Sequence, residues 1–95
     1  MELEDKNRVV ITVLGEDKVG IVAKMTGVLA KYEANILDIS QTLLQDLFAM
    51  IMLVDISKTE TSFEELKEEL QSAGQELQMK VMAQHEDVFR YMHRI

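Results

Sequence analysis

Residues 48–54 read Phe48-Ala49-Met50-Ile51-Met52-Leu53-Val54, an apolar run without interruption. A run of that length suits a β-strand with both faces buried, because a helix so short would be unusual. A second run, Val9-Val10-Ile11-Thr12-Val13-Leu14, is β-branched almost throughout and ends at Gly15. It too is typical of a strand that is apolar on both sides. We therefore expect residues 9–14 and 48–54 to lie at the centre of one sheet.

Two other segments alternate between apolar and polar side chains. In residues 36–43, Asp38, Ser40 and Thr42 face one way and the apolar side chains face the other. In residues 77–84, apolar side chains occupy every second position. Such alternation is typical of strands at the edges of a sheet. The residues Leu44-Gln45-Asp46-Leu47 predict a hairpin loop between residues 36–43 and 48–54.

The segment after Gly15 changes to the period of a helix. Its apolar stripe consists of Ile21, Met25, Val28, Leu29 and Tyr32. Asp17 stands where its carboxylate can accept a hydrogen bond from a free backbone N–H at the start of this helix. Asparagine tolerates the left-handed conformation that ends many helices, so we expect the helix to end at Ala34-Asn35. Gly27 costs about 1 kcal/mol relative to alanine in a helix interior, which indicates close packing there.

A second helix is predicted from Ser62, which forms a capping box with Glu65 three residues later. Its apolar side chains follow at helical spacing and are Phe63, Leu66, Leu70 and Ala73. Residues 85–95 predict a short third helix with apolar residues on one side, namely Val88, Phe89, Met92 and Ile95.

The predicted order of elements is β-α-β-β-α-β followed by a helical tail. This is the order of an α+β, ferredoxin-like sandwich, in which an antiparallel sheet carries two helices on one face. Right-handed crossovers put the first and third strands in the centre, which gives the strand order 4-1-3-2. The chain has no proline and no low-complexity linker, so we expect a single domain over 1–95, with its core at about 7–84 and a helical tail at 85–95.

Two helices cover only one face of such a sheet. Val10, Leu14 and alternate residues of 48–54 then place apolar side chains on the other face. A contiguous apolar surface of this kind is normally covered. The candidates are the C-terminal helix, a second copy of the chain, or both. We expect a homodimer with two-fold symmetry.

The composition disfavours several classes of protein. Ten lysines and arginines against 17 aspartates and glutamates leave a net charge of −7, so we expect neither a nucleic-acid partner nor a membrane partner. The chain has no cysteine, which removes thiol nucleophiles, thiolate metal sites and disulfides. Every apolar run in the sequence is well below the length of about 18 residues that indicates a membrane-spanning helix. Residues 1–8 are polar and acidic and do not resemble a signal sequence, so we expect a cytoplasmic location.

The sequence does not indicate a catalytic or metal site. His85 and His93 lack the i, i+4 spacing of a helical zinc site. Thr12, Ser40 and Thr42 lack a spacing that sets a nucleophile beside its base. We therefore expect no metal, no cofactor and no enzymatic activity.

The loop Gly15-Glu16-Asp17-Lys18-Val19-Gly20-Ile21 has the features of a small-molecule site. A glycine that allows close approach is followed by free backbone N–H groups and by the positive end of a helix dipole. A ligand carboxylate fits those amides, while Asp17 accepts from a ligand ammonium group. An α-amino acid presents both groups. From the residues alone, an ordinary helix cap and turn remains the alternative interpretation.

These residues also resemble a known family. A strand, then Asp17-Lys18-Val19-Gly20-Ile21-Val22, an amphipathic helix, and Ala34-Asn35-Ile36-Leu37 leading into a strand look like an ACT domain, the small-molecule regulatory module of amino-acid metabolism. The resemblance covers residues 7–84. Ile39-Ser40-Gln41-Thr42 and the tail from His85 look closest to small stand-alone ACT proteins. They are similar also to the ACT regions of a glycine cleavage regulator and formyltetrahydrofolate hydrolase.

The resemblance implies a non-catalytic regulatory module that binds a small amino acid or related metabolite at a homodimer interface and signals to a protein partner. The ligand-binding residues that it implies are Asp17, Lys18, Val19, Gly20, Ile21, Asn35 and Ile36. Val19 stands where many members have proline, and Gly15 stands where serine-binding members have histidine, which leaves the ligand open. The alternative is a ligand-free protein-interaction module with the same fold.

Overall fold

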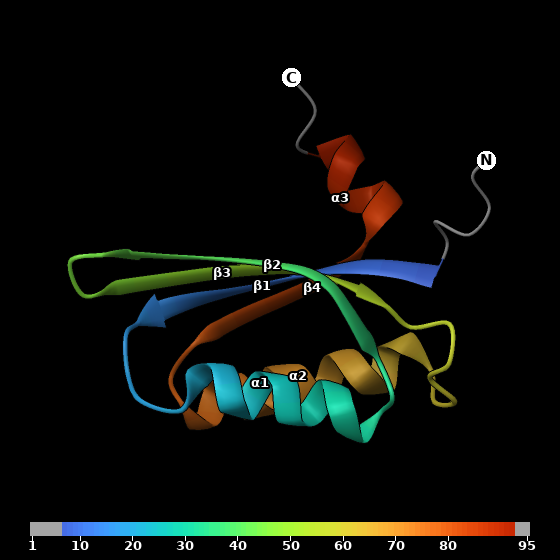
Figure 1. The fold of residues 1–95 in the computed structure, drawn as a ribbon, viewed down its shortest axis with the longest axis horizontal. Coiled ribbons are helices and arrows are strands. Elements are labelled where there is room, and N and C mark those ends of the chain that lie inside the picture. The colour runs from blue at the N-terminus through green and yellow to red at the C-terminus, as the bar shows by residue number, and fades with distance from the viewer. Residues whose placement is uncertain (1–6, 93–95) are drawn as a thin grey trace.

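The structure, a computed structural model, describes residues 7–92. Strands and helices follow one another in the predicted order (Figure 1). The elements are β1 (Arg8–Glu16), α1 (Ile21–Lys31), β2 (Asn35–Leu44), β3 (Leu47–Asp55), α2 (Phe63–Glu76), β4 (Lys80–His85) and α3 (Glu86–Met92). His93 and Ile95 of the predicted tail lie outside the described residues.

The strands that the structure describes form one antiparallel sheet in the order β2-β3-β1-β4. The two apolar runs thus occupy the central strands, where Val10 lies opposite Leu53 and Ile11 lies opposite Met52. Helices α1 and α2 cover one face of the sheet (Figure 1). The ferredoxin-like fold and its strand order are confirmed.

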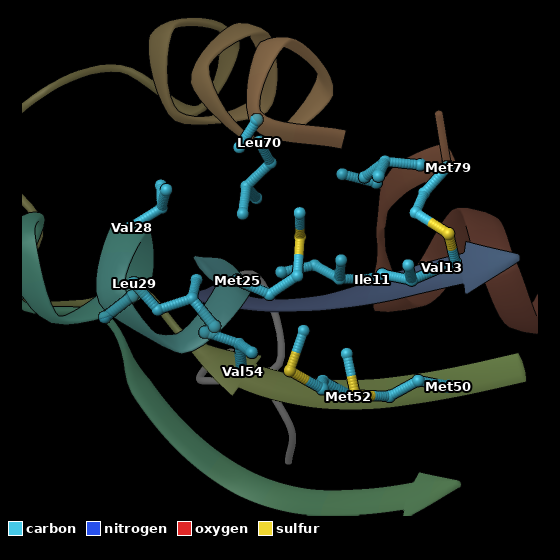
Figure 2. Packing of buried hydrophobic residues seen from close by; sticks show 14 of the residues in the cluster. Ile11, Val13, Met25, Val28, Leu29, Met50, Met52, Val54, Leu70 and Met79 are labelled. Carbon is cyan, nitrogen blue, oxygen red and sulfur yellow. The ribbon is translucent and has the colours of Figure 1, made fainter. Parts of the chain in front are cut away.

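The core lies between the sheet and these two helices, as Figure 2 shows. Its largest fully buried side chains come from both helices and both central strands and include Ile11, Ile21, Met25, Leu29, Met50, Met52, Leu66 and Leu70. Three of them are methionines, whose flexible thioethers fill irregular gaps. The packing of α1 and α2 against the sheet therefore follows the predicted apolar stripes.

Two strands have other boundaries than predicted. β4 begins at Lys80 and not at residue 77, because α2 extends to Glu76 and Gln78 turns the chain with a φ of 59°. β2 is longer than predicted, and its pairing is irregular between Ile36 and Asp38. The hairpin between β2 and β3 is correspondingly tight.

Helices α1 and α2 begin differently. Ser62 caps α2 as predicted, since its hydroxyl oxygen accepts a hydrogen bond from the Glu65 N–H at 3.1 Å. The predicted cap of α1 by Asp17 is wrong, because the N-cap residue is Gly20 and no side chain caps this helix. The Asp17 N–H instead donates to the Asp46 carbonyl at 2.8 Å. The hairpin, and not the helix, therefore holds this part of the loop.

The end of α1 also differs from the prediction. The left-handed residue is Glu33, with a φ of 59°, and not Asn35, which is already the first residue of β2. The Ala34 N–H closes the turn on the Leu29 carbonyl at 2.9 Å. The close packing expected at Gly27 is wrong as well, because this residue is exposed and a Cβ there would meet nothing within 4 Å.

Helix α3 stands on the side of the sheet opposite α1 and α2 (Figure 1). We call this side the outer face. Val10, on the strand β1 that α3 contacts, is only 7% exposed, whereas Ile51 on the same face is 45% exposed. Buried residues alternate with exposed or half-buried ones along β3. The expectation that residues 48–54 are buried on both faces is therefore wrong for a single chain, and α3 covers only part of the outer face.

Candidate functional site

The predicted loop leads from β1 into α1. Asp17 and Val19 are exposed, and Val19 is 98% exposed. The Lys18 ammonium group donates to Gln78 Oε1 at 3.3 Å. Ile21, by contrast, is buried in the core. The loop thus presents a carboxylate and an apolar side chain to solvent, while Ile21 anchors the start of the helix.

Gly20 leaves the backbone open at the start of α1. Its φ of 95° is rarely adopted by residues with a side chain, and nothing lies within 4 Å of the position that a Cβ would take. Its carbonyl accepts the Lys24 N–H at 2.9 Å, which closes the first turn. The first N–H groups of a helix have no partner within that helix. A ligand can therefore approach these amides without meeting a side chain at Gly20.

The first turn of α1 carries neither an acidic residue nor a side-chain cap. The first turn of α2, by contrast, has the Ser62 cap together with Glu64 and Glu65. Negative groups stabilise the positive end of a helix dipole. Helix α2 supplies such groups itself, whereas α1 does not.

Asn35 and Ile36 lie at the other end of α1. The eleven residues of this helix span about 16 Å. Asn35 is exposed and Ile36 is half-buried at the start of β2. The Asp17–Asp46 hydrogen bond holds the loop near the far end of β2. A single chain therefore does not bring Asn35 and residues 17–21 together.

A hollow of about 390 Å³ adjoins Asn35. It is lined by Glu33, Asn35, Asp55, Ser57 and Lys58. The Asp55 carboxylate accepts the Ser57 N–H at 2.8 Å, which fixes one wall. Acidic and basic side chains thus lie close together at the start of β2.

Two ion pairs join α1 to α2. Lys24 Nζ lies 2.7 Å from Glu76 Oε1, and Lys31 Nζ lies 3.2 Å from Glu69 Oε2. The Tyr32 hydroxyl donates to Glu69 Oε1 at 2.9 Å. Hydrogen bonds from Tyr32 and Lys31 lower the pKa of the Glu69 carboxyl. Sequence reasoning missed these contacts, because partners 37 or more residues apart leave no periodic signal.

The residues considered for catalysis are separated by the sheet. His85 lies opposite Val9 on the core side, and its ring is 4.4 Å from that of Phe63. Thr12 and Ser40 lie beside Ile51 on the outer face. The described part of the chain contains no group of three or more His, Cys, Asp or Glu that could hold a metal ion. Within residues 7–92, every helix is too short or too polar to span a membrane.

Comparison with known families matches the ACT domain over residues 7–84. The UPF0237 protein of Methanocaldococcus jannaschii is 60% identical over 89 residues, which are 94% of this chain and 99% of that protein. The UPF0237 protein of Listeria innocua is 46% identical over 88 residues, which are 93% of this chain and 99% of that protein.

Solved structures agree with the family match. An ACT domain protein from Streptococcus pneumoniae is 40% identical with a TM-score of 0.75, and the likeness covers 86% of this chain and 92% of that one. A putative glycine cleavage system transcriptional repressor shares the fold at 22% identity and a TM-score of 0.69, over 81% of this chain and 44% of its own. A formyltetrahydrofolate deformylase from Pseudomonas syringae also shares the fold, at 23% identity and a TM-score of 0.71. This likeness covers 80% of this chain and 26% of the deformylase chain. The chain therefore belongs to the ACT domain family and, over nearly its whole length, to the small UPF0237 proteins within it.

Proposed function

We propose that this protein is a non-catalytic regulatory module that binds a small amino acid or related metabolite between two copies of the chain. The observation that carries the proposal is the start of α1, where the backbone at Gly20 is open and the first turn has no negative group of its own. A ligand carboxylate supplies that charge. A cysteine-free chain also suits a reducing cytoplasm.

An α-amino acid matches the groups around this helix start. Its carboxylate fits the backbone N–H groups that follow Gly20, and its ammonium group fits the exposed Asp17 carboxylate. Ile21 contributes its backbone N–H, since its side chain lies in the core. Lys18 and Val19 border the ligand on the solvent side. A small zwitterion satisfies both charges of the site.

A second copy completes the site. β2 lies at the edge of the sheet, so its outer side offers unpaired backbone groups to another strand. Antiparallel pairing with β2 of a second copy sets Asn35 of one copy against the hairpin end of the other. Residues 17–21 lie at that end, joined to it through Asp46. The Asn35 amide and the Ile36 side chain then approach a ligand held by the loop of the other copy.

Thermal unfolding with each common amino acid at millimolar concentration tests the proposal. A ligand at about ten times its Kd stabilises the folded state by about 1.4 kcal/mol, which raises the Tm of a domain of this size by about 5 °C or more. We expect this rise with one class of amino acid and its loss in the Asp17→Ala/Asn35→Ala variant. Glu60→Ala, at another exposed acidic residue, is the control that keeps the rise. The absence of a shift with every amino acid contradicts the proposal.

The second candidate is a ligand-free interaction module with the same fold. The observation that favours it is Val19, an apolar side chain that is 98% exposed beside Gly20 and suits a protein surface. In that case a protein partner binds the wild type and the Asp17→Ala/Asn35→Ala variant equally well. Partner binding that depends on an added amino acid favours the ligand-binding module instead.

A further inference from the structure

The outer face of the sheet joins an open apolar surface to a projecting helix. Leu47, Ile51 and Met82 are exposed on the sheet. Val88 and Met92 are exposed on α3, at 48% and 61%. All of these residues belong to the side that α1 and α2 leave uncovered (Figure 1). Large apolar patches of this kind mark interaction sites.

The middle of the outer face carries no charge. The register places four residues in one row across the strands: Ser40, Ile51, Thr12 and Met82. The next row toward the hairpin holds Thr42, Ala49, Leu14 and Lys80. In that second row only Lys80, on the edge strand β4, is charged. The rows at the two ends of the face do carry acidic residues, Asp38 opposite Leu53 and Glu16 opposite Leu47. The two middle rows of two copies can therefore meet without bringing acidic side chains together, although the chain has a net charge of −7.

Helix α3 stands at one part of this face, and the β2–β3 hairpin extends away from it (Figure 1). α3 follows β4 directly, and Glu86 in its first turn binds Arg8 at the start of β1. The seven residues of α3 are about 10 Å long. Stacked sheets lie about 10 Å apart. A helix that rises from one sheet therefore spans the gap to a second sheet.

We propose that two copies of the chain stack through their outer faces, around a two-fold axis that lies between the sheets and runs perpendicular to the strands. This axis turns one copy end for end, so α3 of each copy meets the open hairpin end of the other. Val88 and Met92 then pack against Leu47 and Ile51 of the second copy. The surface complements itself because each copy has a helix at one end and an open stretch at the other.

The area of the outer face requires α3 to take part. Strands about 4.8 Å apart and rows about 7 Å apart give the open sheet a flat area of roughly 450 Å². A stable interface takes about 800 Å² from each partner, so the sheet alone is too small and α3 has to contribute to the contact. This contact goes beyond the proposed ligand site, because it leaves the β2 edge and residues 17–21 free. The two interfaces together produce a tetramer.

Disulfide trapping tests the arrangement, because the chain has no cysteine of its own. Met92→Cys combined with Leu47→Cys is expected to give a covalent dimer under mild oxidation at micromolar concentration. Within one chain the two positions lie toward opposite ends of the outer face, so an internal bond does not compete. The control combines Met92→Cys with Leu43→Cys, at an exposed residue on the core side of the same hairpin, and stays uncrosslinked. A Met92→Cys/Leu47→Cys variant that stays uncrosslinked overturns the proposal.

The mass in solution is the second test. Ile51→Lys places a charge in the middle of the outer face, and we expect light scattering to give half the wild-type mass at the same micromolar concentration. Gln75→Lys adds the same charge at an exposed position on α2 and is expected to keep the wild-type mass. Circular dichroism checks that both variants fold. Equal masses for the wild type and Ile51→Lys overturn the proposal and leave the outer face to a partner of different sequence.

Discussion

The guanidinium group of Arg8 lies against the carboxylate of Glu86, with Nε 2.9 Å from Oε1 and Nη2 3.0 Å from Oε2. The two residues are 78 positions apart, so this contact joins the first strand to the last described helix. Arg90, one turn further along α3, donates to the same carboxylate at 2.7 Å. Glu86 is buried. The two cations thus hold a buried anion at the point where α3 meets the sheet.

We predict that Glu86→Ala releases α3 from the outer face. The substitution removes the ion pair with Arg8, and since that guanidinium is partly exposed, we expect a loss of about 2 kcal/mol in the free energy of unfolding. Urea unfolding measures the loss, and faster hydrogen exchange of the α3 amides locates it. Asp87→Ala, at the exposed neighbour in the same turn, is the control and leaves both nearly unchanged. Unchanged exchange in Glu86→Ala contradicts the assignment.

The same carboxylate is predicted to make the docking of α3 depend on pH. Burial raises the pKa of Glu86, but hydrogen bonds and charges from Arg8 and Arg90 outweigh this, so the pKa lies below the ordinary value of 4.5. A carboxyl whose pKa is lowered by folding stabilises the folded state above its unfolded pKa and loses that contribution as the pH falls through its folded pKa. We expect α3 to be docked at neutral pH and to loosen below pH 4.5. The rate of hydrogen exchange of the α3 amides, measured as a function of pH, follows this loosening. If Glu86→Gln shows the same rise in exchange at low pH, the pH dependence comes from another group.

Two glycines in helices are predicted to respond oppositely to alanine. Gly27→Ala places its methyl group in open space and improves helix propensity, so stability rises by about 0.5–1 kcal/mol. Gly74→Ala drives its methyl group into the Val81 side chain and toward the Met79 carbonyl, so stability falls by about 1–3 kcal/mol. Parallel urea unfolding of the two variants measures both changes. Changes of the same sign contradict the packing described for α1 and α2.

The two helix starts predict different effects of removing an oxygen-bearing side chain. Ser62→Ala removes the cap of α2 and lowers the free energy of unfolding by about 1 kcal/mol. Asp17→Ala leaves that free energy nearly unchanged, because no side chain caps α1. Chemical unfolding without ligand measures both. Equal losses in the two variants show that Asp17 has a capping role after all.

The features that the sequence predicted correctly depend on residues within one element or one turn. The runs at 9–14 and 48–54 mark the central strands because their core side is fully buried and their outer side is largely apolar as well. Ser62 is recognisable as a cap because its partner N–H is three residues away. The α1 stripe is buried as predicted except for Tyr32, which is half-buried just beyond the helix, because a helical period alone decides which side meets the sheet.

The features that it did not predict depend on residues far apart in the chain. The backbone N–H of Asp17 donates to the Asp46 carbonyl of the hairpin, a contact that leaves no local pattern, and the Asp17 side chain does not cap α1. The ion pair of Arg8 with Glu86 joins the two ends of the described chain and leaves no pattern in the sequence. For the candidate site, residues 17–21 are adjacent in sequence and in space. The separation of Asn35 from them follows from the length of α1, and in the proposed function a second copy closes it.

The central claim is that residues 17–21 of one copy and Asn35 of another form one ligand site. Mixing the Asp17→Ala and Asn35→Ala variants, and titrating the mixture calorimetrically with the amino acid that raises the Tm, tests this claim most directly. Each variant alone has no complete site, whereas a mixed dimer has one complete site and one doubly altered site. We expect the mixture to regain about one quarter of the wild-type number of sites, since about half of the dimers are mixed. A mixture that binds no more ligand than the separate variants contradicts a shared site.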